Sequence, residues 1–592
     1  MLNRAPLRGL LKHRLHIRGV CNPSAALLQD FRSSRERRLL PETLKGKVNN
    51  LQILLNEDVA KAVNNNIVSL HLPNNLRRVA KNQFLKLQEN EVYELPKTSL
   101  EVDAHIAGFF LRDYAAAFQV LTELKSRLGK SNFNPQRVLD VSLGPATGMI
   151  ALNDVMGAEF RPEEKDAVIT SGSEMTKRAK IMLSRQFNEI PIPPAEAEIP
   201  DTQDKTIDSG GPEVNEDYEL VGEVMTKKIK TVTKLKNTVP VNKKYDLIIL
   251  HHQLLRNRKK FPKQVDENIE TYLKHLAPNG HIVVIERGTP LGFETIARAR
   301  QLMIRPERHP MEHGKISRPW LRGAKMNITE GPGDFYLSIV APCPHHRQCP
   351  LQTGNPNFYN LPQGKKLKFC SFQKSIRRPK FSIELKKGKW LAMPWEDDND
   401  VRKHRELRGK GRPHGKNEET VSFSYLIAKR SPTDPETLQQ IEKTRESSTT
   451  KYETGSLGDN TQDTWPRILT PPSKQKGHVV FDLCAPSGQL EKWIVPKSFS
   501  KEAYHDARKA TKGDLWALDA KTKIQSLGRI NLEKFEKLEK ERVRAIKKED
   551  KERGNKMGDK LKKLDQSEAQ TNIEEMIDES AEAYGYFWKQ DQ

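Results

Sequence analysis

The sequence is poor in cysteine, with five cysteines among 592 residues. Thiols this sparse exclude a scaffold held together by disulfides. Three of them, Cys343, Cys349 and Cys370, fall in one polar stretch, and Cys484 follows an apolar run far downstream. Cys21 stands apart near the N-terminus. The other four cysteines are therefore candidates for one shared site.

Long apolar runs are missing as well, and none is long enough to span a membrane. Apolar residues make up only 36% of the chain and charged residues 30%, which indicates folded domains separated by solvated insertions. Acidic residues are the scarcer charge, 77 against 100 Lys and Arg, and the net charge is +23. This excess favours a polyanionic partner such as RNA, because phosphate contacts release condensed counterions. A generic basic surface is the alternative.

The start of the chain contains no acidic residue before Asp30. Leucines at helical spacing are interleaved there with cations. An acid-free, Arg-rich amphipathic start resembles a mitochondrial presequence, which we predict over residues 1–22. A disordered basic arm is the alternative. The cations are Arg4, Arg8, Lys12, Arg14 and Arg18.

Two predicted regions follow the start. Residues 23–128 are predicted to be helical, since apolar residues recur at helical spacing over Tyr114–Leu128, just before Gly129. Residues 129–342 alternate apolar strands with helices, which predicts an α/β domain with a parallel, doubly wound sheet. Within it, residues 190–225 have the composition of a disordered insertion. Ligands of such a sheet bind beyond the carboxyl ends of its strands.

A glycine-containing turn follows the first predicted strand of the α/β domain. Asp140, Gly144 and Gly148 lie where this strand leads through the turn into a helix. Small residues there let the backbone approach a bound nucleotide closely, although a tight turn without a ligand has the same pattern. The order of strands and this loop resemble the S-adenosylmethionine-dependent methyltransferases. The resemblance implies that Asp140, Gly144 and Gly148 bind S-adenosylmethionine.

The chain departs from the methyltransferase pattern at three positions. Ser142 and Ala146 stand where that family usually has glycine, and Ser171 stands where an acid usually holds the ribose hydroxyls. His251 and His252 end a later predicted strand, in the region where catalytic residues of such enzymes often lie. A structural or merely exposed histidine pair is the alternative, and the catalytic residues stay unknown.

Four thiolates are soft ligands that select zinc or an iron–sulfur cluster. The first two cysteines of the set are five residues apart, and long gaps lead to the other two. Because structural zinc sites use tighter pairs, this spacing favours a cluster, with zinc as the second choice. His345 and His346 are possible zinc ligands, and four unligated thiols are a further alternative. The predicted metal ligands are Cys343, Cys349, Cys370 and Cys484.

Residues 343–520 are predicted to contain this metal site and a small C-terminal β module, which the metal joins to the sheet. Within them, residues 365–389 hold ten Lys or Arg and one acid, with Phe369, Phe372 and Phe381 interleaved. Cations neutralise phosphates and rings stack on unpaired bases, so we predict an RNA-binding surface. A solvated basic loop is the alternative.

The final region, residues 521–592, is predicted to be a charged helical tail. Several motifs upstream of it resemble one family, the methyltransferase-like proteins of the mitochondrial small ribosomal subunit, which has bacterial relatives. The motifs lie at Ile285–Pro290, Cys343–His345, Cys349–Pro350, Phe369–Gln373, Pro471–Cys484 and Ala507–Trp516.

This resemblance implies that the four cysteines hold a [4Fe-4S] cluster. It also implies an rRNA-binding assembly or stability factor of the small subunit, needed for mitochondrial translation, with small-subunit rRNA and ribosomal proteins as partners in the mitochondrial matrix. An active S-adenosylmethionine-dependent rRNA methyltransferase is the alternative. A redox enzyme is disfavoured because no flavin or second-cluster motif is visible in the sequence.

Overall fold

A computed structural model describes most of the chain and divides it into two compact units, residues 1–354 with 369–527, and residues 355–368 with 528–592. The predicted presequence, Cys21 and most of the predicted insertion lie outside the described residues. No helix in the described part is long and apolar enough to cross a membrane. The described residues are 38–48, 52–129, 132–191, 222–304, 335–361, 366–387, 417–526, 531–553 and 555–556.

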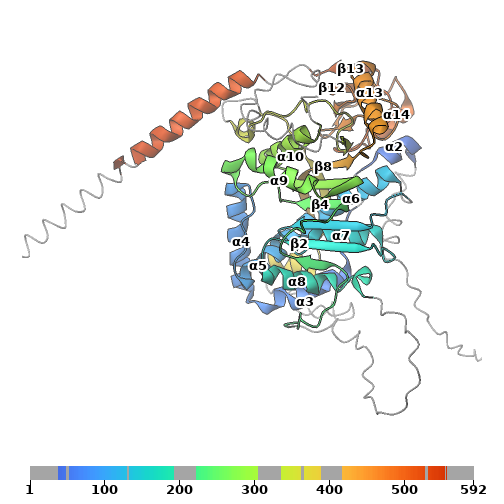
Figure 1. Cartoon of the computed structure of the whole chain (residues 1–592). Coiled ribbons are helices and arrows are strands. Elements are labelled where there is room, and N and C mark those ends of the chain that lie inside the picture. The colour runs from blue at the N-terminus through green and yellow to red at the C-terminus, as the bar shows by residue number, and fades with distance from the viewer. Residues whose placement is uncertain are drawn as a thin grey trace, which may run out of the picture. The chain divides into compact units, whose positions relative to one another are not determined.

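The first unit is built on a large mixed sheet (Figure 1), which has eight strands among the described residues. The strand order is β3-β2-β1-β4-β5-β8-β6, with β7 also paired to β8. Strands β1 to β5 are parallel, as predicted, whereas β8 runs antiparallel to β5, β6 and β7. The strands are β1 Arg137–Ser142, β2 Glu164–Ile169, β3 Lys234–Lys236, β4 Tyr245–His251, β5 Leu276–Arg287, β6 Leu337–Ala341, β7 Phe372–Arg377 and β8 Glu418–Arg430.

Both faces of this sheet are covered by helices. Leu247 and Ile249 of β4 belong to a core shared with the N-terminal helices, α7 and α8, whereas Ile248 and Leu250 belong to a second core with α9 and α10. Alternate residues of a strand point to opposite faces, so an uninterrupted apolar strand is what a doubly covered sheet requires. These helices are α7 Thr147–Met156, α8 Ser173–Leu183, α9 Lys263–Leu273 and α10 Pro290–Met303, with short 3₁₀ turns η4 Phe187–Glu189 and η5 Arg258–Lys260.

The N-terminal region is helical, as predicted. A capping box between Thr98 and Glu101 starts α5, which continues through the π-helical turn η3 into α6 and ends at Gly129, with φ of 84°. α5, η3 and α6 together form one continuous helical rod that packs on the sheet. The helical elements of the whole N-terminal region are α2 Pro41–Gly46, α3 Glu57–Asn66, η2 Val68–Leu70, α4 Pro73–Asn90, α5 Ser99–His105, η3 Ile106–Phe110 and α6 Leu111–Leu128.

Strands β6 and β7 lie one after the other along the same edge of β8. β6 pairs with residues 427–430 of β8, and β7 pairs with residues 418–423. Between them the chain leaves the sheet after Ala341 and returns at Phe372. The large sheet therefore takes strands from both sides of residue 342, where the sequence prediction put a domain boundary.

The C-terminal part of the first unit forms a second, antiparallel sheet, in the order β10-β11-β12-β13 with β9 beside β11. Phe481, Trp493 and Trp516 fill its core. This sheet is the small β module that the sequence predicts. Its elements are β9 Arg467–Ile468, β10 Ser473–Lys474, β11 His478–Cys484, β12 Leu490–Pro496, β13 Thr522–Gln525 and α14 Lys501–Ala507. Two further helices of the first unit are α12 Lys380–Lys387 and α13 Pro435–Lys451.

The second unit contains the 3₁₀ turn η8, Pro356–Asn360, and a helix over residues 532–553. Phe358, Leu361 and Phe535 form a cluster of buried apolar residues in this unit. The rings of Phe358 and Phe535 lie 6.0 Å apart, and Asn357 donates to Glu539 at 3.1 Å. The start of the predicted charged tail is thus a helix that buries one apolar side chain against η8.

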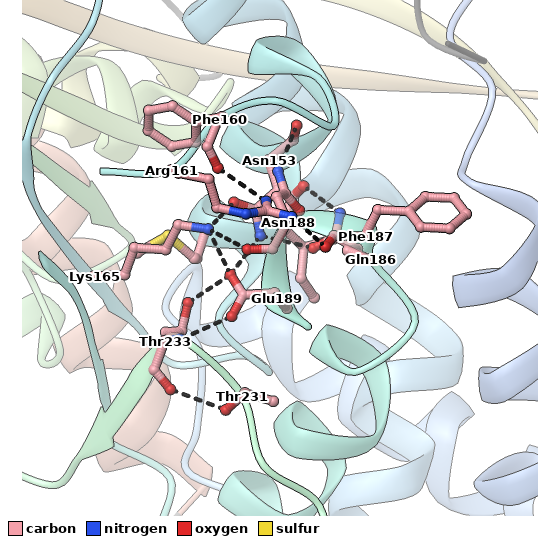
Figure 2. Close-up of polar contacts among 12 residues, drawn as sticks. Asn153, Phe160, Arg161, Lys165, Gln186, Phe187, Asn188, Glu189, Thr231 and Thr233 are labelled. Carbon is pink, nitrogen blue, oxygen red and sulfur yellow. Dashed lines mark hydrogen bonds and ion pairs between the residues drawn. The ribbon is translucent and has the colours of Figure 1, made fainter. Parts of the chain in front are cut away.

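A fully paired buried lysine anchors the base of the 190–225 segment (Figure 2). Lys165 of β2 donates to Asn153, to the carbonyl oxygen of Asn188 and to Glu189, at 2.9 to 3.1 Å. Glu189 in turn accepts from the amide and hydroxyl of Thr233. Because Glu189 precedes the segment and Thr233 follows it, one ion pair holds both ends of the segment against β2.

We predict that Glu189→Gln destabilises the first unit by about 3–5 kcal/mol, because it leaves the Lys165 ammonium buried without a counterion. Urea and thermal unfolding measure the loss. The matched control is Glu57→Gln, since Glu57 is 69% exposed and pairs with Lys61 on the surface of α3. An exposed pair of this kind is worth about 0.5 kcal/mol. Equal effects of the two substitutions would contradict the prediction.

Candidate functional site

The four predicted metal ligands line one cavity. Cys343 lies two residues after the end of β6, and Cys370 lies two residues before the start of β7. The segment between β6 and β7, residues 342–371, is called the excursion below. Because β6 and β7 pair with the same edge of β8, the two ends of this excursion lie at that edge. Cys349 lies within that excursion, and Cys484 is the last residue of β11 in the other sheet. The fold thus brings together side chains that are far apart in the sequence.

The rest of the cavity wall is apolar, apart from two arginines, Ser424 and Tyr425. Arg300 and Arg467 are its charged residues, and none of the described residues that line it is a carboxylate. Burial, and then the neighbouring Cys343, raises the pKa of Cys349 to about 12. Burial also raises the pKa of Cys370 and Cys484, and the other thiols add to this effect. Charge on these thiols therefore needs a cation among them, as metal ligation supplies.

The histidines beside Cys343 have other partners. His346 accepts the amide hydrogen of Ile339 on Nε2 at 2.8 Å. His345 is buried with Nε2 3.3 Å from Cys484 Sγ, and its carbonyl oxygen accepts from Arg300 at 2.8 Å. Burial and then Arg300 hold the pKa of His345 well below its usual value. A neutral His345 is placed to hydrogen-bond the Cys484 sulfur and leaves four thiols as the donor set.

The predicted cofactor loop is used largely for packing within the protein. Asp140 is buried, and its Oδ2 accepts the amide hydrogen of Met149 at 3.0 Å, in the first turn of α7. Burial raises the pKa of Asp140 to about 7, against the opposing effect of the Met149 and Gly148 amides. A Cβ at Gly148 would lie 2.5 Å from Asp140 Oδ1 and 2.8 Å from Ile249. Gly148 thus allows α7 to approach β1 and β4.

The departures from the methyltransferase pattern have structural counterparts. Ala146 has the left-handed φ of 54°, a conformation that glycine adopts without strain. A Cβ at Gly144 would meet the Thr147 hydroxyl at 2.9 Å. The Ser171 hydroxyl donates to the carbonyl oxygen of Leu143 and so ties the end of β2 to the loop. The serine in place of the ribose-binding acid is thus engaged within the protein.

A second cavity lies at the carboxyl ends of β1, β4 and β5, where ligands of such sheets bind. Leu143, His252 and Glu286 line it, and Tyr93 from the segment between α4 and α5 covers it. The Tyr93 and His252 rings lie 4.6 Å apart. The N-terminal helical region therefore closes over the predicted ligand-binding end of the sheet.

The predicted histidine pair is buried in a charged cluster at this end. His252 approaches Asp113 Oδ1 with Nε2 at 3.4 Å and Glu286 Oε2 with Nδ1 at 3.2 Å. Burial opposes charge on His252, but these carboxylates outweigh it and raise its pKa to about 9. Burial and the stacked His252 ring lower the pKa of His251 to about 3. The sequence analysis missed Asp113, because nothing in a helical segment signals its partner on a distant strand.

The predicted RNA-stacking aromatics are largely wrong. Phe372 and Phe381 are buried in the core of the first unit, and Lys374 is only 4% exposed. The reason is strand alternation, since Phe372, Lys374 and Ile376 share the inward face of β7. Burial lowers the pKa of Lys374 to about 8. These side chains are therefore not available to an RNA strand.

Comparison with known sequences finds mitochondrial ribosome proteins. A profile described as "Mitochondrial small ribosomal subunit Rsm22" matches residues 401–517. The chain is 53% identical over 543 residues to "Ribosome assembly protein RSM22, mitochondrial" of Saccharomyces cerevisiae, covering 90% of this chain and 86% of that protein. It is 26% identical over 434 residues to "Rsm22-cox11 tandem protein 2, mitochondrial" of Schizosaccharomyces pombe, covering 72% of this chain and 45% of that protein.

Solved structures with a similar arrangement include methyltransferases. The plantazolicin methyltransferase BpumL, in complex with a monoazolic desmethylPZN analog and SAH, matches with a TM-score of 0.24 and 9% identity over 60% of this chain and 95% of that one. PKMT2 from Rickettsia typhi matches with a TM-score of 0.16 and 15% identity, over 37% and 35% of the two chains. At these low scores, the description of the fold rests on the strand order given above.

We predict opposite effects of two substitutions in the loop between β1 and α7. Gly148→Ala should lower the free energy of unfolding by about 1–3 kcal/mol, because the added methyl overlaps Asp140 and Ile249. Ala146→Gly should be neutral or raise it by up to about 1 kcal/mol, because glycine relieves the left-handed strain. Denaturant unfolding measures both changes. Gly477→Ala is the control, since no atom lies within 4 Å of its added Cβ. A destabilising Ala146→Gly would refute the strain argument.

Proposed function

The chain belongs to the Rsm22 family of mitochondrial small ribosomal subunit proteins, and from this premise we propose that it is an assembly or stability factor of that subunit, acting in the mitochondrial matrix. The observation that carries the proposal is the 53% identity to the yeast ribosome assembly protein over 90% of this chain. The net charge of +23 supports direct contact with small-subunit rRNA, alongside ribosomal proteins.

The proposed role includes a [4Fe-4S] cluster held by Cys343, Cys349, Cys370 and Cys484. The donor set fits this group, because four thiols and no carboxylate line one cavity among the described residues. Zinc is the second choice, because structural zinc sites use cysteine pairs with two to four residues between the ligands, whereas five residues separate Cys343 and Cys349. A cluster with four thiolates carries a net negative charge, and Arg300 and Arg467 in the cavity wall offset it.

The cluster's role would be structural. Cys343, Cys349 and Cys370 belong to the excursion between β6 and β7, whereas Cys484 ends β11 in the second sheet. Ligation by all four would fasten the excursion to the β11–β12 turn, where Arg347 already donates to the carbonyl oxygen of Ser487 at 2.6 Å. The position of the C-terminal module relative to the segment between β6 and β7 would then depend on iron loading.

We predict that Cys349→Ser removes the iron chromophore and weakens association with the small subunit together. Iron and acid-labile sulfide are measured on full-length protein purified without air, and association is measured by sedimentation with the small subunit. Leu469→Met is the matched control, because Leu469 lines the same cavity without offering a thiol and the exchange keeps the volume. Iron with matching sulfide in the control decides for a cluster, whereas zinc without sulfide decides against it. Unchanged colour and unchanged association in Cys349→Ser would exclude the structural role.

An active S-adenosylmethionine-dependent rRNA methyltransferase is the second candidate. The cavity at the carboxyl ends of β1, β4 and β5 favours it, because His252 and Glu286 line the place where this cofactor's substrates would react. Against it, the Asp140 carboxylate already accepts an α7 amide hydrogen, and the Ser171 hydroxyl donates to the loop.

We expect that S-adenosylmethionine gives no saturable heat in calorimetry of the iron-loaded, full-length protein, because Ser171 stands where an acid usually holds the ribose hydroxyls. The wild type and Gly148→Ala are titrated in parallel, so that a contribution of the loop can be recognised. Saturable binding by the wild type that Gly148→Ala abolishes would support the methyltransferase, and transfer of a labelled methyl group to small-subunit rRNA would establish it.

A further inference from the structure

A cluster of metal-binding side chains lies at the carboxyl ends of β4 and β5, with ligands of different chemistry from the four-cysteine set. It consists of Asp113 from the first turn of α6, His251 and His252 from the end of β4, and Glu286 from β5. One ligand atom each of Asp113, His251 and His252 lie within 4.8 Å of one another. This is the spacing of donors that can share one ion.

The cluster is buried, and two of its polar atoms have no hydrogen-bond partner within the described part of the chain. They are His251 Nε2 and Glu286 Oε1, on side chains of residues that are 3% and 7% exposed. A buried polar atom without a partner costs about 1–3 kcal/mol. A metal ion bound in the cluster would supply the missing interaction of His251 Nε2.

An ion pair without metal explains only part of this arrangement. A charged His252 can donate to Asp113 with Nε2 and to Glu286 with Nδ1. In this ion pair, the two carboxylates of Asp113 and Glu286 share the single positive charge of His252. His251 Nε2 still has no hydrogen-bond partner in the described part of the chain. A divalent ion balances both carboxylates when His252 is neutral, and it also accepts a lone pair from His251.

We propose that Asp113, His251 and His252 bind one divalent transition-metal ion, with Zn²⁺ as the reference case. Two imidazoles and one carboxylate are a ligand set that proteins use for Zn²⁺ and Fe²⁺. Glu286 is then a positioning residue, because its carboxylate accepts from His252 Nδ1–H and directs Nε2 towards the ion, as in other carboxylate–histidine–metal arrangements. The left-handed φ of 55° at His252 turns the ring into this position.

The expected effect of the ion is to lock α6 to the sheet. Asp113 lies on the rod formed by α5, η3 and α6, whereas His251 is the last residue of β4 and His252 follows it. The ring of Tyr93 packs on His252, and its hydroxyl donates to Asp113 at 3.2 Å. Binding would therefore also hold Tyr93 over the second cavity.

Cobalt titration of the full-length protein tests this proposal. Protein purified without air is dialysed against a chelator and titrated with Co²⁺. Imidazole and carboxylate ligands give visible d–d bands without the near-ultraviolet thiolate-to-cobalt band, which separates this site from the cysteines. We expect about one equivalent of thiolate-free Co²⁺ in the wild type and in Cys349→Ser. Zinc should raise the melting temperature of both.

Four variants decide the outcome. His251→Gln and Asp113→Asn should lose this signal, and Glu286→Gln should weaken Co²⁺ affinity by about 10–100-fold. His281→Gln is the matched control, because His281 Nε2 is also buried without a partner, on the same sheet but away from the carboxylates, and it should bind as the wild type does. If Glu286→Gln, which keeps the shape of the cluster, binds as tightly as the wild type, Glu286 has no positioning role. A wild type that takes up no thiolate-free Co²⁺, or a His251→Gln variant with an unchanged spectrum, would overturn the site in favour of a metal-free ion pair.

Discussion

A buried guanidinium joins the C-terminal module to α6 and to β8 of the large sheet. Arg467 of β9 is 1% exposed, and it donates to Glu123 of α6 and to the carbonyl oxygen of Gly513 in its own module. The Tyr425 hydroxyl of β8 donates to the same Glu123 carboxylate. Such a pair adds little net stability over apolar packing, but loss of one partner costs about 3–5 kcal/mol. Arg467 can reach Glu123 only when the module is docked as it is in this structure. This ion pair therefore contributes to the placement of β11 and Cys484.

That docking determines the geometry around the cysteines. Cys343 and Cys370 are held by the pairing of β6 and β7 with β8, which needs no metal, and Ser424 of β8 donates to the carbonyl oxygen of Cys370 at 2.8 Å. Cys484 reaches them only through the contact between the two sheets. Three of the four cysteines thus lie at one sheet edge or in the segment between β6 and β7, whereas the position of Cys484 depends on how the C-terminal module docks.

Much of the large sheet could be predicted from the sequence, because β1, β2, β4 and β5 are buried on both faces and appear as apolar runs. The segment around β7 could not be interpreted correctly, since its cations conceal the alternation that buries Phe372 and Ile376. The grouping of the four cysteines followed from their rarity and from a family resemblance, whereas their approach depends on strand pairing. Asp113 was missed for the same reason, because its contact with His252 arises only when α6 packs on β4.

The packing of Tyr93 on His252 in the second cavity is relevant to the alternative of a methyltransferase. Arg287 at the end of β5 donates to the carbonyl oxygens of Leu87 and Glu91, and it thereby holds the C-terminal end of α4 beside the cavity. A base in an RNA strand would have to displace Tyr93 to reach His252, and the Asp113 contact opposes this displacement. An enzyme acting on a large substrate needs this end open, whereas an assembly factor needs it only to stay folded. The packing of Tyr93 on His252 therefore favours the proposed assembly factor over the alternative of an rRNA methyltransferase.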